Sequence, residues 1–378
     1  MGIFNFLKRK NEAEAAPVQE IPVQDAPVQE TEAPVAEEEQ PALTSLSAFT
    51  EEALPTASGL YPHEILMLHL APAFHPENNS FQKFWLDVYG VCSPQTILDR
   101  LLEQGYIEVS GMEEAISHLT VTKLRELLQQ FGLSPAGKKA EMVRRLLDME
   151  DQSQLEALCP ERYFVRTEKG EKELKENWYV PYLHSHRNAI PLTIWAASRQ
   201  IHQEKKDFSQ ILLETLKAGA GAHLNSHDYA QYRNACLANY AALQDAGMDQ
   251  EAFHCLCETA YYDLSGLGDG ETLLQDESPA SLRSFLTAKE KLLSGHFMLV
   301  VPAVKQSLRQ EQEQRELSDE DFRVLLLEEF DGVELPFQLF SNEECADLLL
   351  AVIHDDTETP ARLLDSAKAR LQEELSAH

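Results

Sequence analysis

Apolar residues recur at three- and four-residue spacing over most of this chain, and this spacing restricts the fold more than any other feature of the sequence. Phe81, Phe84 and Trp85 form one such stripe. Two short runs, 106–109 and 163–165, are instead typical of β-strands. The sequence therefore predicts a mainly α-helical fold.

The charge of the chain is strongly acidic and unevenly distributed. Its 378 residues include 63 acidic and 32 basic side chains, which gives a net charge of −31 at pH 7. Because uniform negative charge repels phosphate, the chain is not a basic protein that coats nucleic acid over its whole surface. Residues 118–148 reverse the sign, with six bases against three acids, whereas 188–378 carry 33 acids and 15 bases. The charge distribution is therefore compatible with a small basic module within an otherwise acidic chain.

The first 57 residues differ from the rest in composition. Residues 1–10 place three cations beside apolar side chains, and this segment is either a weak anchor to a membrane or partner or a frayed start without consequence. Membrane attachment is the less expected alternative. Residues 11–57 hold eleven acids, no Lys or Arg, and a tandem repeat (APVQE, IPVQD, APVQE) at 16–30. Such a segment cannot bury enough apolar area to offset its ordering entropy, so we expect a disordered acidic linker.

Two features of the whole chain suggest its compartment. No apolar run approaches the roughly 18 residues that a bilayer span requires. Six cysteines without a secretion signal fit a reducing cytoplasm better than a disulfide scaffold. We therefore expect a cytoplasmic protein.

The order of elements before residue 187 resembles a winged helix-turn-helix domain formed by 58–110 and 162–187. Three helices are predicted first, then two strands, then a polar helix that begins near TEKG, and the first five elements occupy 62–70, 81–88, 94–104, 106–109 and 162–166. The resemblance implies that the strands pair as the wing and that the third helix is the recognition helix. It also implies an inserted domain between the strands. The polar face of the third helix carries two carboxylates against one arginine, which does not favour contact with DNA: Asp99, Arg100, Glu103 and Gln104.

Residues 117–148 (SHLTVTKLRELLQQFGLSPAGKKAEMVRRLLD) predict two short helices joined by a glycine-containing loop. Thr120 is a plausible N-cap of the first helix, and Gly132 ends it. The second helix is expected over 138–148. The predicted buried faces are Val121, Leu124, Leu127 and Leu128 in the first helix and Met142, Val143, Leu146 and Leu147 in the second.

This segment closely resembles the SAP motif, a helix–extended loop–helix module that binds DNA. The pattern L-x-V-x-x-L-x-x-L-L begins at Leu119, and G-x-K-x-E-[LIM]-[IV]-x-R-L begins at Gly137, with Met142 in place of the commoner leucine. The residue chemistry agrees, because Gly137 permits close approach of the backbone to a phosphate and Lys138 and Lys139 lie at a helix N-terminus. Glu141 is expected to cap or brace that helix. The predicted nucleic-acid-binding residues are Lys123, Arg125, Gly137, Lys138, Lys139, Arg144 and Arg145. The alternative is a helical hairpin whose Lys and Arg side chains are merely solvated.

The acidic remainder, 188–378, predicts an all-helical domain. A turn or extended piece is expected before it, at 178–187, because of Pro181. Residues 228–265 predict a helical hairpin similar to a degenerate tetratricopeptide unit. Further helices are expected at 281–293, 296–314, 318–330, 342–354 and 360–375. The negative charge favours a protein partner, or packing on the winged region, over contact with DNA.

Several groups of residues lack the spacing that a chemical site requires. His63, Glu64 and His69 do not have zinc-protease spacing, and His184 with His186 is an isolated pair. The loop 266–271 (GLGDGE) follows a helix and lacks the lysine of a nucleotide-binding loop. His254, Cys255 and Cys257 cannot share a metal on a straight helix. We expect no catalytic residue, metal, cofactor or small-molecule substrate.

Two interpretations follow for the whole chain. The first is a non-enzymatic protein whose SAP-like segment holds the backbone of duplex DNA with little sequence specificity. In it, the C-terminal half binds a protein or stabilises the body. The second is a protein-interaction scaffold that binds no nucleic acid directly.

Overall fold

The computed structural model describes residues 54–77, 79–149, 153–159, 162–268, 279–294 and 299–377. The predicted basic N-terminus 1–10 lies outside these residues, and so does the predicted linker 11–57 except for its last four positions. Two of those four positions, Leu54 and Thr56, contact the rest of the described chain. Ser198 Oγ donates to the Leu54 carbonyl at 2.7 Å, and Thr56 is buried.

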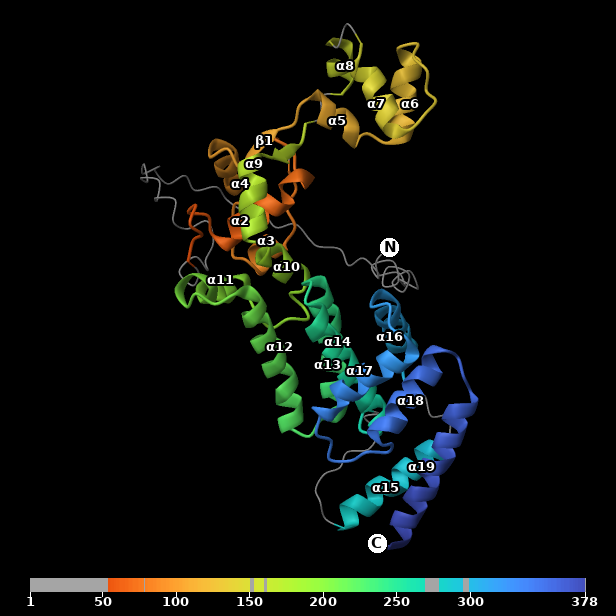
Figure 1. Ribbon diagram of the computed structural model, residues 1–378. Helices are drawn as coiled ribbons and strands as arrows, with labels where there is room; N and C mark the ends of the chain where they lie inside the picture. Colours follow the sequence, from red (N-terminus) through yellow and green to blue (C-terminus); the bar gives the residue numbers. More distant parts are fainter. Residues whose placement is uncertain are drawn as a thin grey trace, which may run out of the picture. The chain divides into compact units, whose positions relative to one another are not determined.

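The described part of the chain is mainly α-helical, which confirms the prediction from apolar spacing (Figure 1). Of the helices in the described residues, none combines the length and the apolar character that a membrane span requires. The helices are α2 (Pro62–Leu70), the 3₁₀ helix η2 (Ala71–Ala73), α3 (Phe84–Asp87), α4 (Pro94–Glu103), α5 (Met112–His118), α6 (Val121–Gln130), α7 (Lys139–Leu147), α8 (Ser153–Leu158), α9 (Glu168–Glu176), α10 (Tyr179–Ser185), α11 (Ile194–Gln203), α12 (Phe208–Asn225), α13 (Tyr229–Asp245), α14 (Asp249–Ser265), α15 (Pro279–Ser294), α16 (Pro302–Gln314), α17 (Asp319–Asp331), α18 (Asn342–Ile353) and α19 (Glu358–Ala377).

Two short strands, β1 (Ile107–Val109) and β2 (Phe164–Arg166), form an antiparallel ladder. Ser110 extends this ladder, because its N–H donates to the Tyr163 carbonyl at 2.7 Å and its Oγ accepts the Tyr163 N–H at 3.0 Å. The predicted pairing of the two strands is therefore confirmed. The chain leaves the ladder after Ser110 and returns to it at Tyr163.

Helix α10 occupies a segment where a turn or extended piece was expected, so that prediction was wrong. Pro181 is the third residue of this helix. The first four N–H groups of a helix have no intrahelical acceptor, so proline is tolerated there without the loss of a hydrogen bond. Tyr179, Val180 and Leu183 are buried, and their packing favours the helix.

The buried apolar residues fall into two separate clusters. The larger, which we call the main core, extends from Leu60 to Leu371 and contains side chains from both sides of residue 187. The smaller, which we call the hairpin core, lies entirely within the segment between the two strands and is composed of Ile116, Leu124, Leu127, Leu128, Met142, Val143, Leu146, Leu155 and Cys159. The segment between the strands therefore has an apolar core of its own.

Helices α13 and α14 pack along each other as the predicted hairpin (Figure 1). Gly247 lies in the turn between them with φ +70°, and Ala252 is fully buried, which permits the close approach of the two helices. Helices α16, α17 and α18 pack against α14, and α15 packs against α19.

Candidate nucleic-acid interface

The predicted two-helix segment consists of α6, a loop over 131–138, and α7. Thr120 caps α6 as predicted, because its side chain accepts the Lys123 N–H at 3.2 Å. The buried faces also follow the prediction, with the exceptions of Val121, which is 37% exposed, and Leu147, which is partly buried.

Two helices that the sequence interpretation missed, α5 and α8, complete the hairpin core. They contribute Ile116, Leu155 and, just after α8, Cys159. Glu113 and Glu114 in the first turn of α5 are the signal that could have revealed it, since acidic side chains favour a helix N-terminus.

The loop before α7 is held by Arg145, which lies nearly two turns further along, in the last turn of that helix. Arg145 Nη1 donates to the carbonyl oxygens of Ser134 at 2.8 Å and Ala136 at 2.5 Å. Its Nη2 lies 3.7 Å from the Glu141 carboxylate. That carboxylate also accepts the backbone N–H of Lys138 at 3.1 Å, which confirms the predicted capping role of Glu141. The guanidinium and the carboxylate therefore fix the loop on both sides of Gly137.

Gly137 is required by this arrangement. Its φ is +113°, and a Cβ at this position would overlap the Glu141 carboxylate and approach Arg145 Nη2 to 3.0 Å. The space beside Gly137 is thus filled by the chain's own side chains. Glu141 also takes one of the free N–H groups at the start of α7, the Lys138 N–H, that were expected to face a phosphate.

The other predicted cations are exposed to solvent. Lys138 and Lys139 lie at the start of α7, and the Arg144 side chain is 83% exposed, against 34% for that of Arg145. Their surface ion pairs, such as Arg144 with Asp148 at 3.6 Å, contribute little and are readily exchanged for another anion.

Lys123 and Arg125 lie on opposite flanks of α6. Each is separated from the buried Leu124 by about 100° around the helix axis, in opposite directions. One flat or gently curved ligand surface therefore contacts one of these two side chains more readily than both.

Helix α4, the expected recognition helix, does not present a free arginine. Arg100 Nη1 donates to Glu64 Oε1 at 2.6 Å, and Glu64 is fully buried. Burial raises the pKa of Glu64, while the Tyr61 N–H, at 2.8 Å, and Arg100 act against this rise. Arg100 therefore stabilises the interior carboxylate of α2, and Asp99 and Glu103 remain as charges on the outer face of α4.

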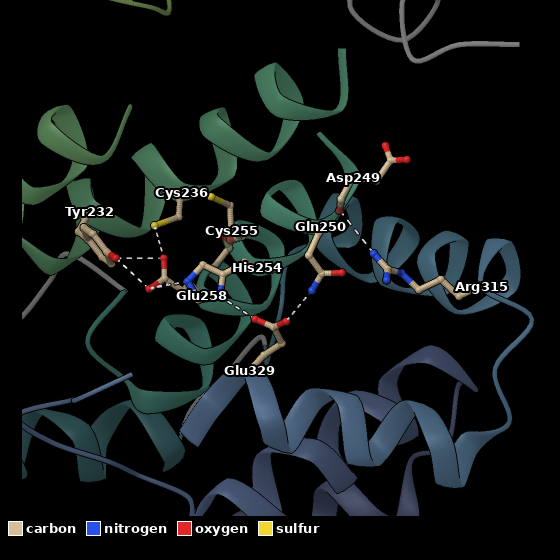
Figure 2. A network of polar contacts seen from close by, with 10 residues as sticks. Tyr232, Cys236, Asp249, Gln250, His254, Cys255, Glu258, Arg315 and Glu329 are labelled. Carbon is tan, nitrogen blue, oxygen red and sulfur yellow. Dashed lines mark hydrogen bonds and ion pairs between the residues drawn. The ribbon is translucent and has the colours of Figure 1, made fainter. Parts of the chain in front are cut away.

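Of the candidates on α14, His254 belongs to a polar network that joins helices (Figure 2), whereas burial raises the pKa of the Cys255 and Cys257 thiols. His254 Nδ1 lies 2.6 Å from Glu329 Oε2, which raises the pKa of His254. Tyr232 donates to both oxygens of Glu258 at 3.0 Å, and Cys236 Sγ lies 3.4 Å from the same carboxylate. Burial raises the pKa of Cys236, which favours the protonated thiol over the thiolate.

Two further observations concern the remaining candidate sites. Within the described residues, no group of three His, Cys, Asp or Glu side chains is arranged to hold a metal ion. In the loop 266–271, Gly266 ends α14 in the left-handed conformation, and residues 269–271 lie outside the described ranges.

The comparison with known proteins bears on the segment that contains α6, the loop and α7. No curated protein and no solved structure matches this chain. The family model of the SAP domain, a general DNA- or RNA-binding motif, matches residues 115–148. The match begins within α5 and ends just after α7, so it coincides with most of the segment that has its own core.

Proposed function

We propose that this chain is a non-enzymatic protein that binds the sugar–phosphate backbone of nucleic acid, duplex DNA in particular, through α6, the loop and α7. The observation that carries the proposal is the set of exposed cations on this hairpin. Residues 115–148 bring six bases against three acids in a chain whose net charge is −31. Phosphate is the common polyanion that such a local reversal of sign suits.

The contact residues follow from exposure and from helix geometry. Lys138 and Lys139 are exposed at the start of α7 and Arg144 is exposed in its last turn, and one of Lys123 and Arg125 adds a contact from α6. Three or four phosphates are then neutralised. Contacts of this kind carry no base information, so binding has little sequence specificity.

The proposal also covers the surrounding domain and the compartment. Helices α2, α3 and α4 with β1 and β2 follow the element order of a winged helix, with the hairpin inserted at the tip of the wing. The outer face of α4 is acidic, so in this proposal the domain carries the hairpin and does not read bases. All six cysteines are free thiols, which suits a reducing cytoplasm.

A salt titration of the full chain on a labelled DNA duplex tests the proposal. With three or four phosphate contacts, the slope of log affinity against log salt concentration is about −2.7 to −3.6. The triple variant Lys138→Ala, Lys139→Ala and Arg144→Ala loses three contacts, and its slope becomes less negative by about 2.7. Affinity falls alike on duplexes of different sequence.

A matched variant removes the same charge elsewhere. It carries three substitutions at exposed positions of α9, α12 and α19, outside the hairpin: Lys172→Ala, Lys217→Ala and Arg362→Ala. We expect this triple variant to show the wild-type salt slope. Equal effects of the two triple variants would reject a localised interface. No measurable duplex binding by the wild type at low salt would reject the proposal and favour a scaffold whose basic hairpin meets an acidic protein.

A further inference from the structure

Arg144 and Arg145 are neighbours in sequence with different surroundings. Arg144 extends into solvent, and its partner among the described contacts is the exposed Asp148, at 3.6 Å. Arg145 turns back over the loop, where Ser134 and Ala136 accept from its Nη1. A guanidinium donates in a planar fork, and two of the directions of this fork are already directed at loop carbonyls.

The contacts of Arg145 reach the residues that we place on the phosphates. Glu141 lies between Arg145 Nη2 and the backbone N–H of Lys138, so the guanidinium is connected through one carboxylate to the start of α7. The same guanidinium holds the carbonyls of Ser134 and Ala136 in the loop before Gly137. The positions from which the Lys138 and Lys139 side chains extend are thereby fixed relative to α7.

We propose that Arg145 is a positioning residue for the phosphate-binding loop and does not itself contact phosphate. This inference rests on the proposed function. A loop that is ordered before binding loses less conformational entropy when phosphate contacts form, so it binds more tightly with the same contacts. Removal of the brace weakens affinity by about ten-fold and leaves the number of neutralised phosphates unchanged.

The salt slope separates a positioning residue from a contact residue. The full chain is titrated on the DNA duplex at salt concentrations from about 50 to 200 mM, as wild type and as Arg144→Gln and Arg145→Gln. Both variants lose one positive charge. We expect Arg144→Gln to make the slope less negative by about 0.9. We expect Arg145→Gln to keep the wild-type slope and to weaken binding by a similar factor at every salt concentration.

A third variant, Arg145→Lys, keeps the charge and removes the fork. An ammonium group donates from a single point and cannot span both carbonyls and the carboxylate with the same geometry. We therefore expect Arg145→Lys to bind as weakly as Arg145→Gln. A phosphate contact predicts the opposite, namely near wild-type affinity for the lysine variant and a less negative slope for the glutamine variant, and that result would overturn the inference.

Amide hydrogen exchange tests the brace without DNA. In Arg145→Gln we expect faster exchange at the Lys138 N–H, while the backbone amides of Leu124 and Leu128 in α6 keep wild-type protection. Unchanged exchange at Lys138 in a folded hairpin would overturn the inference. If the wild type binds no duplex, the proposed function fails, and the exchange measurement still decides whether Arg145 holds the loop.

Discussion

His63 is a buried histidine whose ring nitrogens have no hydrogen-bond partner within the part of the chain that the structure describes. Its side chain is 1% exposed and lies against Trp195, with ring centroids 5.4 Å apart. Burial, assisted by the nearby charge of Arg100, lowers the pKa of His63 to about 3. His63 is therefore a neutral buried side chain packed against Trp195 of the main core.

The protonation of His63 predicts a loss of stability in mild acid. The unfolded chain binds a proton near the ordinary pKa of 6.5, whereas the folded chain does so only near pH 3, so the stability is present above pH 6.5 and is lost as the pH falls. At pH 5 the loss in the free energy of unfolding that His63 causes is about 2 kcal/mol. The free energy of unfolding, measured with urea, should fall between pH 7 and pH 5 in both proteins. The fall should be smaller in His63→Phe than in the wild type, by about 2 kcal/mol.

A surface histidine supplies the control for this measurement. His227→Asn changes an exposed side chain at φ +58°, which asparagine tolerates, and should keep the wild-type pH dependence. His184, whose pKa burial lowers to about 4, acts in the same direction as His63 and leaves some acid sensitivity in the phenylalanine variant. An identical pH dependence of His63→Phe and wild type would contradict the interpretation.

At the scale of elements, the start of α9 is attached to the turn between α4 and β1. Thr167 Oγ1 donates to the Gly105 carbonyl at 2.8 Å, and Lys169 Nζ donates to the Gln104 carbonyl at 2.8 Å. Lys169 Nζ also lies 3.8 Å from the centroid of the Tyr106 ring. The helix after β2 thereby fixes the entry to β1.

Gly170 permits this close approach, and its replacement should separate the two elements. A Cβ at Gly170 would overlap the carbonyl oxygen of Tyr106, so Gly170→Ala forces α9 away from the turn and should cost about 1–3 kcal/mol of unfolding free energy. Gly219→Ala on α12 meets open space and should stabilise by up to about 1 kcal/mol. Urea midpoints compare the two, and equal midpoints would show that α9 does not depend on this contact.

The elements that the sequence predicted well are those with a local signal. Thr120 and the leucine spacing define α6, and the β-like residues around Ile107 and Phe164 define the strands. Helix α10 escaped prediction because a proline near a helix start looks the same in sequence as a helix breaker. The stripe at 81–88 became the four-residue α3, since apolar spacing does not determine helix length.

The contact of Arg145 with the loop before α7 could not be predicted from the sequence, for a different reason. Arg145 looks equivalent to Arg144 in the sequence, and both were predicted to meet phosphate. The loop carbonyls of Ser134 and Ala136 accept hydrogen bonds from Arg145 in a loop that turns into α7 at Gly137, where φ is +113°. Tertiary contacts of this kind depend on the path of a loop, which residue spacing does not specify.

At the scale of the whole molecule, the separation of the two cores implies separate unfolding. Among the described residues the hairpin core holds nine buried side chains; α5 and α6 each pack against α7, and α8 contributes Leu155. A domain with so small a core has only a few kcal/mol of stability to lose. The main core does not include any of its side chains.

The two separate cores should respond independently to the loss of a buried side chain. Leu124→Ala removes a fully buried side chain of the hairpin core, at a cost of about 2–5 kcal/mol, which is enough to unfold most of the hairpin. Amide exchange should then lose protection in α6 and α7 and keep it in α13 and α14, and duplex binding should disappear with the fold of the hairpin. Leu256→Ala, in the main core, should give the reverse pattern of protection. If either substitution reduced protection equally in both regions, the two cores would unfold as one cooperative unit, and the proposed nucleic-acid interface would depend on the body of the protein for its fold.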